Sequence, residues 1–281
     1  MISQEKLNKT EPGMVAVIGI PHDENSSFMK GAALAPEKIR SVMHNGASHL
    51  CAENGVDLSA EAGFIDLENM VLDGKTPATE VIESTISGLV EQGVYTISLG
   101  GDHSVTYPIV KAYAKQYGPM NIVQFDAHPD LYDVYDGNAL SHACPFARIM
   151  EEQLAEHLIQ VGIRTLNPHL REQVDKYAVE VIELKDWESS WIPNISGPVY
   201  LSIDLDVLDP AFAPGVSHHE PGGLTTRDII NFIQNLNTPV VGADIVELNP
   251  KRDINDMTAA VAVKLLKEIA GVMIRHNTLE L

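Results

Sequence analysis

The stretch VYTISLGGDHS, from Val94 to Ser104, sets the pattern for the fold. Its apolar and β-branched residues end abruptly at two glycines, which charged and polar side chains follow. A short apolar run that ends at such a turn is typical of a strand buried on both faces, as in a parallel sheet. Comparable runs recur along the chain, at Met14–Pro21, Asn121–Phe125, Leu158–Ile163, Val179–Leu184, Val199–Leu205 and Pro239–Val246.

Amphipathic stretches of helical length separate these runs. They lie at Ala35–Leu50, Pro77–Gln92, Ser104–Tyr117, His142–His157, Thr225–Gln234 and Asp256–Ile274. Pro36 suits the first turn of a helix, and Ser104 and Thr225 suit helix caps. The alternation of strand and helix predicts a doubly wound α/β fold. Because no linker or repeat interrupts it, we expect a single domain over residues 1–281 with a short polar segment at 1–12.

The composition is that of a globular, acidic protein. Of 281 residues, 39 are Asp or Glu and 19 are Lys or Arg, which gives a net charge of −20. This acidity argues against nucleic-acid or anionic-membrane partners and suits cationic ligands and metal ions. Two cysteines cannot form a disulfide framework, and we see neither a signal-peptide pattern nor a run of 18 apolar residues. We therefore expect a soluble, cytoplasmic protein.

Polar residues follow three of the expected strands at the point where each strand ends. Parallel strands end at a common edge, and alternate residues of an extended chain point the same way, so these side chains can converge. A single aspartate there is most simply a turn or cap residue. Together, the group is better explained as metal ligands: His103 in GGDHS, Asp126, His128 and Asp130 in DAHPD, and Asp204 and Asp206 in DLD.

The number and type of these residues indicate two metal ions. Four carboxylates at one edge would repel one another and need cations to stay ionised. Six ligands are too many for one tetrahedral zinc, whereas carboxylates shared between two ions fit the count. Mostly oxygen ligands favour Mn(II), so we expect two Mn(II) ions per chain. A water molecule shared by two ions loses a proton readily, which predicts metal-assisted hydrolysis of a cationic substrate.

The segments GGDHS, DAHPD, SIDLDVLDP and PGGLT resemble the signature segments of the ureohydrolases, the arginase/agmatinase family. The similarity runs from about Val15 to about Glu268. It implies a single-domain, three-layer α/β/α fold with a mostly parallel sheet and a binuclear Mn(II) site. It also implies hydrolysis of a small cationic guanidino substrate to urea and an amine, by a homotrimer or homohexamer.

The resemblance also assigns roles to individual residues. It gives one metal His103, Asp126, Asp130 and Asp204, and the other Asp126, His128, Asp204 and Asp206. His142 resembles the histidine that passes a proton to the departing amine, and Glu247 the carboxylate that grips the guanidinium group. Asp130 would also hold the attacking hydroxide. Tyr132 and Asn138 are further expected substrate contacts.

The substrate is the least specific part of the prediction. Agmatinases resemble this chain in having tyrosine at Tyr132, and Asp133 and Asp136 would repel a substrate carboxylate if their loop faces the pocket. This favours agmatine, cleaved to putrescine and urea. The alternative is L-arginine, cleaved to ornithine and urea, because SHACPFARIME, PGVSHHEPGGL and VGADIVELNPKRD resemble plant arginases. Another guanidino compound, such as 4-guanidinobutyrate, is a further alternative.

Three other classes of protein fit the sequence less well. A two-metal phosphoesterase should supply basic residues for phosphate, whereas these motifs supply carboxylates. A non-catalytic family member should have lost metal ligands. A deacetylase of related fold uses one zinc and lacks the full GGDHS segment. We expect His218 and His219 to lie on an exposed rim loop rather than to bind metal.

Overall fold

The centre of the molecule is a parallel sheet of eight strands in the order β2-β1-β3-β8-β7-β4-β5-β6. The structure is a computed structural model that describes residues 2 and 4–279. The strands are β1 (Val15–Gly19), β2 (Phe64–Asn69), β3 (Tyr95–Leu99), β4 (Met120–Phe125), β5 (Ala155–Ile163), β6 (Glu180–Glu183), β7 (Val199–Asp204) and β8 (Val240–Val246).

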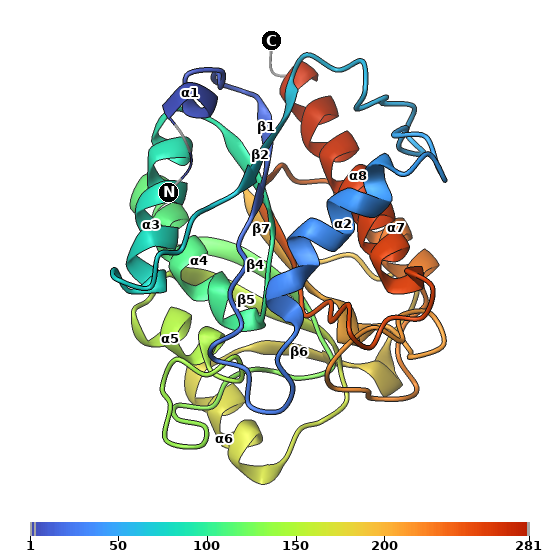
Figure 1. Cartoon of the computed structure of the whole chain (residues 1–281). Helices are drawn as coiled ribbons and strands as arrows, with labels where there is room; N and C mark the ends of the chain where they lie inside the picture. The colour runs from blue at the N-terminus through green and yellow to red at the C-terminus, as the bar shows by residue number, and fades with distance from the viewer. Residues whose placement is uncertain (1, 3, 280–281) are drawn as a thin grey trace.

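Helices cover both faces of the sheet, as the expected three-layer α/β/α fold requires (Figure 1). Helices α3 and α4 pack together, and α5 packs against α4 on the same side. On the other side α8 packs against α2 and α7. The helices are α1 (Gln4–Leu7), α2 (Ala35–His44), α3 (Ala78–Glu91), α4 (Thr106–Tyr117), α5 (Pro145–Glu151), α6 (Pro168–Tyr177), α7 (Thr226–Asn235) and α8 (Met257–Leu279).

Two apolar cores lie between the sheet and its helical layers. Along β1, Val15 and Val17 face the core that includes α2, α7 and α8, while Ala16 and Ile18 face the core that includes α3 and α4. This alternation follows from the two-residue period of a strand. All residues of β1, β4, β7 and β8 are buried, which explains why these strands are nearly continuous apolar runs.

The seven expected strands are present, but several helix boundaries differ from the prediction. The stretch His142–His157 is helical only at Pro145–Glu151, and His157 lies in β5. The helix expected at Ala35–Leu50 ends at His44, because Asn45 and Gly46 follow and Gly46 has a φ of 83°. Pro36 lies in the first turn, as expected.

The two expected caps also differ in outcome. Thr225 forms a full capping box with Asp228 at the start of α7, as predicted. Ser104 is not a cap. It lies inside a 3-10 turn, His103–Val105, whose cap is Asp102, because the Asp102 carboxylate accepts the Ser104 backbone N–H.

Three of the helices and strands were not predicted: the four-residue helix α1, strand β2 and helix α6. Strand β2 forms one edge of the sheet, and its sequence FIDLEN mixes apolar and charged residues. One of the charged residues, Asp66, accepts a hydrogen bond from Arg40 on α2. Helix α6 buries only Leu170 and Gln173, so it lacks a clear apolar stripe. Among the described residues, no helix has the length and apolar character that a membrane crossing requires.

Gly101, at the end of β3, supports a testable prediction about the fold. A Cβ atom there would lie 1.6 Å from the carbonyl oxygen of His22, because Gly101 follows β3 and the loop after β1 runs beside it, where His22 accepts the Asp102 N–H. We expect Gly101→Ala to lower the free energy of unfolding by about 3 kcal/mol, as overpacking does. In α3, Gly88 has open space around it, and Gly88→Ala should instead stabilise by about 0.5–1 kcal/mol. Urea denaturation of both variants tests the pair, and equal stability of Gly101→Ala and wild type would contradict the contact.

Candidate metal centre and active site

Four neighbouring strands at the middle of the sheet, β3, β8, β7 and β4, bring the expected residues together. His103 follows β3, Glu247 follows β8, Asp204 ends β7, and Asp126 follows β4. Parallel pairing puts the carboxyl ends of these strands at one edge. Strands β1–β3 form one half of the sheet, and β4–β6 extend the other half in the opposite direction. The direction of strand order therefore reverses near these central strands. In α/β sheets, ligands bind at the carboxyl ends of the strands at such a point.

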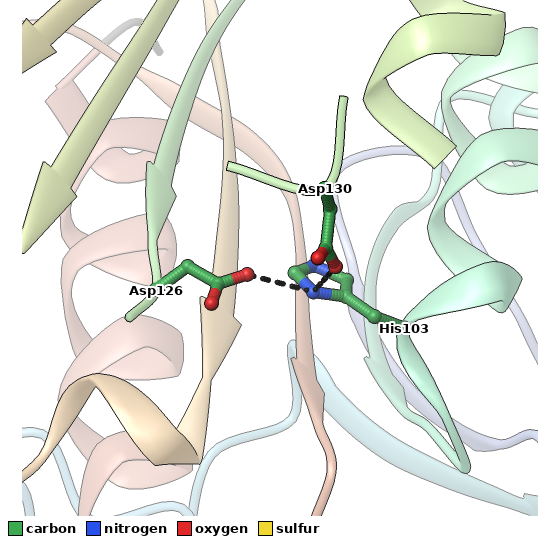
Figure 2. A group of neighbouring side chains, drawn as sticks. All are labelled: His103, Asp126 and Asp130. Carbon is green, nitrogen blue, oxygen red and sulfur yellow. Dashed lines mark ion pairs between the residues drawn. The ribbon is translucent and has the colours of Figure 1, made fainter. Parts of the chain in front are cut away.

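The first group of side chains surrounds the Nδ1 atom of His103 (Figure 2). This nitrogen lies 3.0 Å from Asp126 Oδ2, 3.1 Å from Asp130 Oδ2 and 3.2 Å from Asp204 Oδ2. All four residues are buried. Figure 2 shows the carboxylates of Asp126 and Asp130, both from the segment that follows β4, converging on the imidazole of His103.

The second group shares one member with the first. His128 Nδ1 lies 3.0 Å from Asp206 Oδ2 and 3.5 Å from Asp126 Oδ1. The carboxylate of Asp126 therefore faces His103 with one oxygen and His128 with the other. These two His–Asp groups are suited to hold two ions, with Asp126 between them.

The geometry and charge of the first group fit a divalent cation. His103 Nδ1 is buried and makes no hydrogen bond of good geometry to the carboxylates around it. Two ligands at right angles, each about 2.1 Å from an ion, lie about 3.0 Å apart, which matches the N···O distances of this group. Burial and the charge of Asp126 raise the pKa of Asp130 to about 6. Burial and the charges of Asp206 and Asp126 raise the pKa of Asp204 well above its usual value. A cation would relieve this repulsion.

Backbone N–H groups hold the carboxylates in place. Ala127 N–H donates to Asp206 Oδ1 at 3.1 Å, His128 N–H to Asp126 Oδ1 at 2.6 Å and Asp206 N–H to Asp204 Oδ1 at 2.8 Å. Asp130 and Glu247 adopt positive φ angles of 49° and 65°, which is uncommon for residues other than glycine. Such strain is concentrated at functional sites, where the surrounding structure enforces it.

His142 and Glu247 form a buried pair beside the two groups. His142 Nδ1 lies 2.8 Å from Glu247 Oε1, which also accepts the His103 backbone N–H at 2.9 Å. On the other side of the ring, His142 Nε2 lies 2.8 Å from Ser27 Oγ, which can accept a hydrogen bond from the protonated imidazole. Burial would lower the pKa of His142, but the charges of Glu247, Asp130 and Asp102 outweigh it and raise this pKa to about 9.

A cavity opens above these residues and brings most of the predicted site together. His103 and Asp126 are fully buried and lie outside its lining. The predicted residues that line it are His128, Asp130, Tyr132, His142, Asp204, Asp206 and Glu247.

Asn138, a predicted substrate contact, lies outside the cavity lining. Its amide group donates to Asn25 Oδ1 and its oxygen accepts the Leu140 N–H. Tyr132 does line the cavity, and its hydroxyl accepts a hydrogen bond from Asn167.

Sequence reasoning left several cavity residues unassigned, Ser27 among them, and it placed His218 on the active-site rim but underestimated how far it is buried. His218 was expected to be exposed on a rim loop, but it is half-buried and lines the cavity, with its ring centroid 5.8 Å from that of His128 and 5.4 Å from that of His142. The signal that could have predicted this burial was the place of His218 in the loop that follows β7, a strand whose end carries predicted metal ligands. Nothing in the sequence marks Ser27, because only the tertiary structure brings it to His142. His219 is exposed, as expected.

Comparisons with known proteins agree with this geometry. The family model described as "Arginase family" matches residues 14–271. Arginase 1, mitochondrial, of Arabidopsis thaliana is 42% identical over 91% of this chain and 80% of its own length. The agmatinase of Bacillus anthracis is 34% identical over 92% of this chain and 91% of its own length. The solved arginase from Medicago truncatula superposes with a TM-score of 0.86 at 38% identity, covering 96% of this chain and 91% of that one. The chain therefore belongs to the arginase family of ureohydrolases.

Proposed function

We propose that this ureohydrolase cleaves L-arginine to L-ornithine and urea with two Mn(II) ions. The observation that carries the choice of substrate is the difference in similarity, 42% identity to a plant arginase against 34% to an agmatinase, each over more than nine-tenths of this chain. Our expectation from the sequence put agmatine ahead, and the relatives favour its alternative.

The structure weakens the argument that had favoured agmatine. Asp133 and Asp136 were expected to repel a substrate carboxylate if their loop faced the pocket. Neither residue lines the cavity. Asp133 instead accepts a hydrogen bond from Gln173 and lies 3.1 Å from His169.

Agmatine is the second candidate, and the charge of the cavity favours it. Among the described residues that line the cavity, five are acidic and none is Lys or Arg. Three of the five are proposed metal ligands, which leaves Glu220 and Glu247 to attract a cationic substrate. A substrate with a guanidinium group at one end and an ammonium group at the other suits such a surface. An arginine carboxylate would have to rely on neutral donors such as Ser27, Tyr135 and Thr165.

The donor set supports Mn(II) as the metal. Carboxylate oxygens outnumber imidazole nitrogens in both groups, and oxygen-rich sets suit Mn(II) better than softer metals. We assign one ion to His103, Asp126, Asp130 and Asp204, and the other to Asp126, His128, Asp204 and Asp206. Bound there, the ions would activate water for attack on the guanidinium carbon.

The side chains around the cavity would orient the substrate and move its protons. Glu247 lines the cavity, and its carboxylate can pair with a planar guanidinium group and fix the carbon that is attacked. His142 is held between Glu247 and Ser27. Its raised pKa keeps it protonated near neutral pH, so that it can give a proton to the departing amine.

The shared position of Asp126 predicts a change in metal content. Asp126→Ala should lose both Mn(II) ions, because its two oxygens face the two groups. Asp204→Ala should behave in the same way. Glu247→Ala is the control. It should keep about two ions per chain, because Glu247 belongs to neither group, and it should lose activity, because the substrate is no longer oriented. Elemental analysis after gel filtration measures the ions, and an Asp126→Ala protein that retains two would contradict the assignment.

The role of His142 predicts a loss in turnover without a loss of metal. His142→Asn should lower kcat by about 10²–10⁴-fold, because the departing amine no longer receives a proton from the enzyme. The Mn(II) content should not change. His157→Asn, at an exposed position of β5, is the matched control. Steady-state kinetics with added Mn(II) makes the comparison, and a kcat for His142→Asn near that of wild type would rule out this role.

The choice between substrates is tested by specificity constants. We expect kcat/KM for L-arginine to exceed that for agmatine by about tenfold or more, which corresponds to about 1.4 kcal/mol of transition-state binding. 4-Guanidinobutyrate, which has the carboxylate but no ammonium group, serves as a third substrate. A higher kcat/KM for agmatine would reverse the proposal in favour of the second candidate. Urea release from none of the three would contradict ureohydrolase activity itself.

A further inference from the structure

A chain of buried hydrogen bonds runs from His103 away from the cavity and into the sheet. His103 Nε2 lies 2.9 Å from Ser202 Oγ on β7. Ser202 Oγ donates to Asp244 Oδ1 on β8 at 2.7 Å. The three residues have no exposed surface. They therefore connect the metal-facing imidazole to a carboxylate inside the protein that solvent does not reach.

The direction of these hydrogen bonds fixes the tautomer of His103. A serine hydroxyl has one proton, and Ser202 gives it to Asp244. Ser202 Oγ must then accept from His103, so Nε2 carries a proton. Nδ1 is then free to present its lone pair to an ion, and it is the atom that Asp126, Asp130 and Asp204 surround.

The surroundings of Asp244 indicate that this carboxylate has a function. Its second oxygen accepts hydrogen bonds from Thr106 Oγ1 at 2.9 Å and Tyr200 Oη at 2.7 Å. Within the described part of the chain, no Lys or Arg forms an ion pair with it. A buried carboxylate without a cationic partner lowers stability. The fold nevertheless contains this buried carboxylate, and its hydrogen-bond path leads through Ser202 to the His103 imidazole.

The register of the sheet explains how the arrangement is built. Ser202 on β7 pairs directly with Asp244 on β8, so both side chains project to the same face of the sheet. Thr106, in the first turn of α4, and Tyr200, two residues before Ser202, close the same face. Rigid central strands thus hold the hydrogen-bond chain, and they leave His103 little freedom to rotate.

We propose that Asp244, acting through Ser202, is a positioning residue that locks the His103 imidazole in its metal-binding tautomer and orientation, and so strengthens the metal site of His103, Asp126 and Asp130 selectively. The proposal rests on the binuclear site of the proposed function. It concerns the ion at the first group and leaves the group of His128 and Asp206 largely unaffected. Hydrogen bonds to the second nitrogen of a metal-bound histidine contribute about 10–100-fold to metal affinity in general.

The experiment is a calorimetric titration of metal-free protein with Mn(II). Wild type should bind two ions. Ser202→Ala should weaken one of them by about 10–100-fold and change the other much less. Tyr200→Phe is the matched control, because it removes a hydrogen bond to the same carboxylate but keeps the path from Asp244 through Ser202 to His103. Both of its Mn(II) affinities should equal those of wild type.

A double-mutant cycle separates positioning from a general loss of packing. In a His128→Ala background, where only the first group remains, Ser202→Ala should reduce Mn(II) affinity by the same factor as in wild type. In a His103→Ala background it should have no effect, because no imidazole is left to position. If Ser202→Ala does not fold, Asp244→Asn, which keeps the side-chain volume, takes its place with the same expectation.

The outcomes distinguish this inference from the proposed function. Equal weakening by Ser202→Ala and Tyr200→Phe, or an effect that persists without His103, would overturn the positioning role. So would unchanged Mn(II) affinity in folded Ser202→Ala, provided that wild type binds two ions and releases urea. Wild-type protein that binds no pair of ions would instead overturn the proposed function, and the inference with it.

Discussion

Buried negative charge at the carboxyl end of the sheet is the constraint on which the rest of this site depends. Asp126, Asp130, Asp204 and Asp206 lie within a few ångströms of two imidazoles and are almost completely shielded from solvent. Backbone N–H groups offset part of their charge, but burial and mutual repulsion still raise the pKa of Asp130 and of Asp204. Two divalent cations would supply the missing positive charge, and Asp126, which belongs to both His–Asp groups, would link them.

The parallel sheet creates this concentration of charge without exposing it. All strand ends point the same way, so each central strand delivers a polar residue to the same edge, while helices on both faces exclude water from the strands. The residues at the floor of the cavity follow directly from rigid strands, and the cavity-lining residues Ser27, Tyr132 and His218 come from loops. This division suits an enzyme family that keeps one chemistry and varies its substrates.

The sequence was most informative where one short segment carries a whole pattern. GGDHS, DAHPD and DLD each follow a buried strand, so the metal-facing residues could be predicted from strand ends and the two-residue period alone. Edge strand β2 and helix α6 escaped prediction because neither has a clear apolar face. Ser27 was missed for another reason: it meets His142 across 115 positions of sequence, and no local signal records that contact.

Asp244 could be noticed in the sequence, but its role could not be predicted from it. An acidic residue within the apolar run VVGADIV is unusual enough to be noticed in the sequence. Its connection to His103 depends on Ser202, however, and therefore on the register between β7 and β8, which are separated in the chain by a long loop and helix α7. Sequence patterns of single segments cannot give that register. The sequence was also insufficient to predict the substrate. Asp133 and Asp136 lie in the same loop as the cavity residues Tyr132 and Tyr135, yet they do not line the cavity.

The strand that joins the two halves of the sheet is the last one to be synthesised. Strand β8 lies between β3 and β7, so β2-β1-β3 and β7-β4-β5-β6 have no direct pairing until Val240–Val246 is inserted. His103 belongs to one half, and Asp126 and Asp204 to the other. The second group, made of Asp126, His128 and Asp206, can therefore form within one half, because β4 and β7 pair directly. His103 meets Asp126 and Asp204 only after β8 has paired with both β3 and β7. Completing the first group thus requires the long-range pairing that closes the whole sheet, whereas the second group requires only the pairing of β4 with β7.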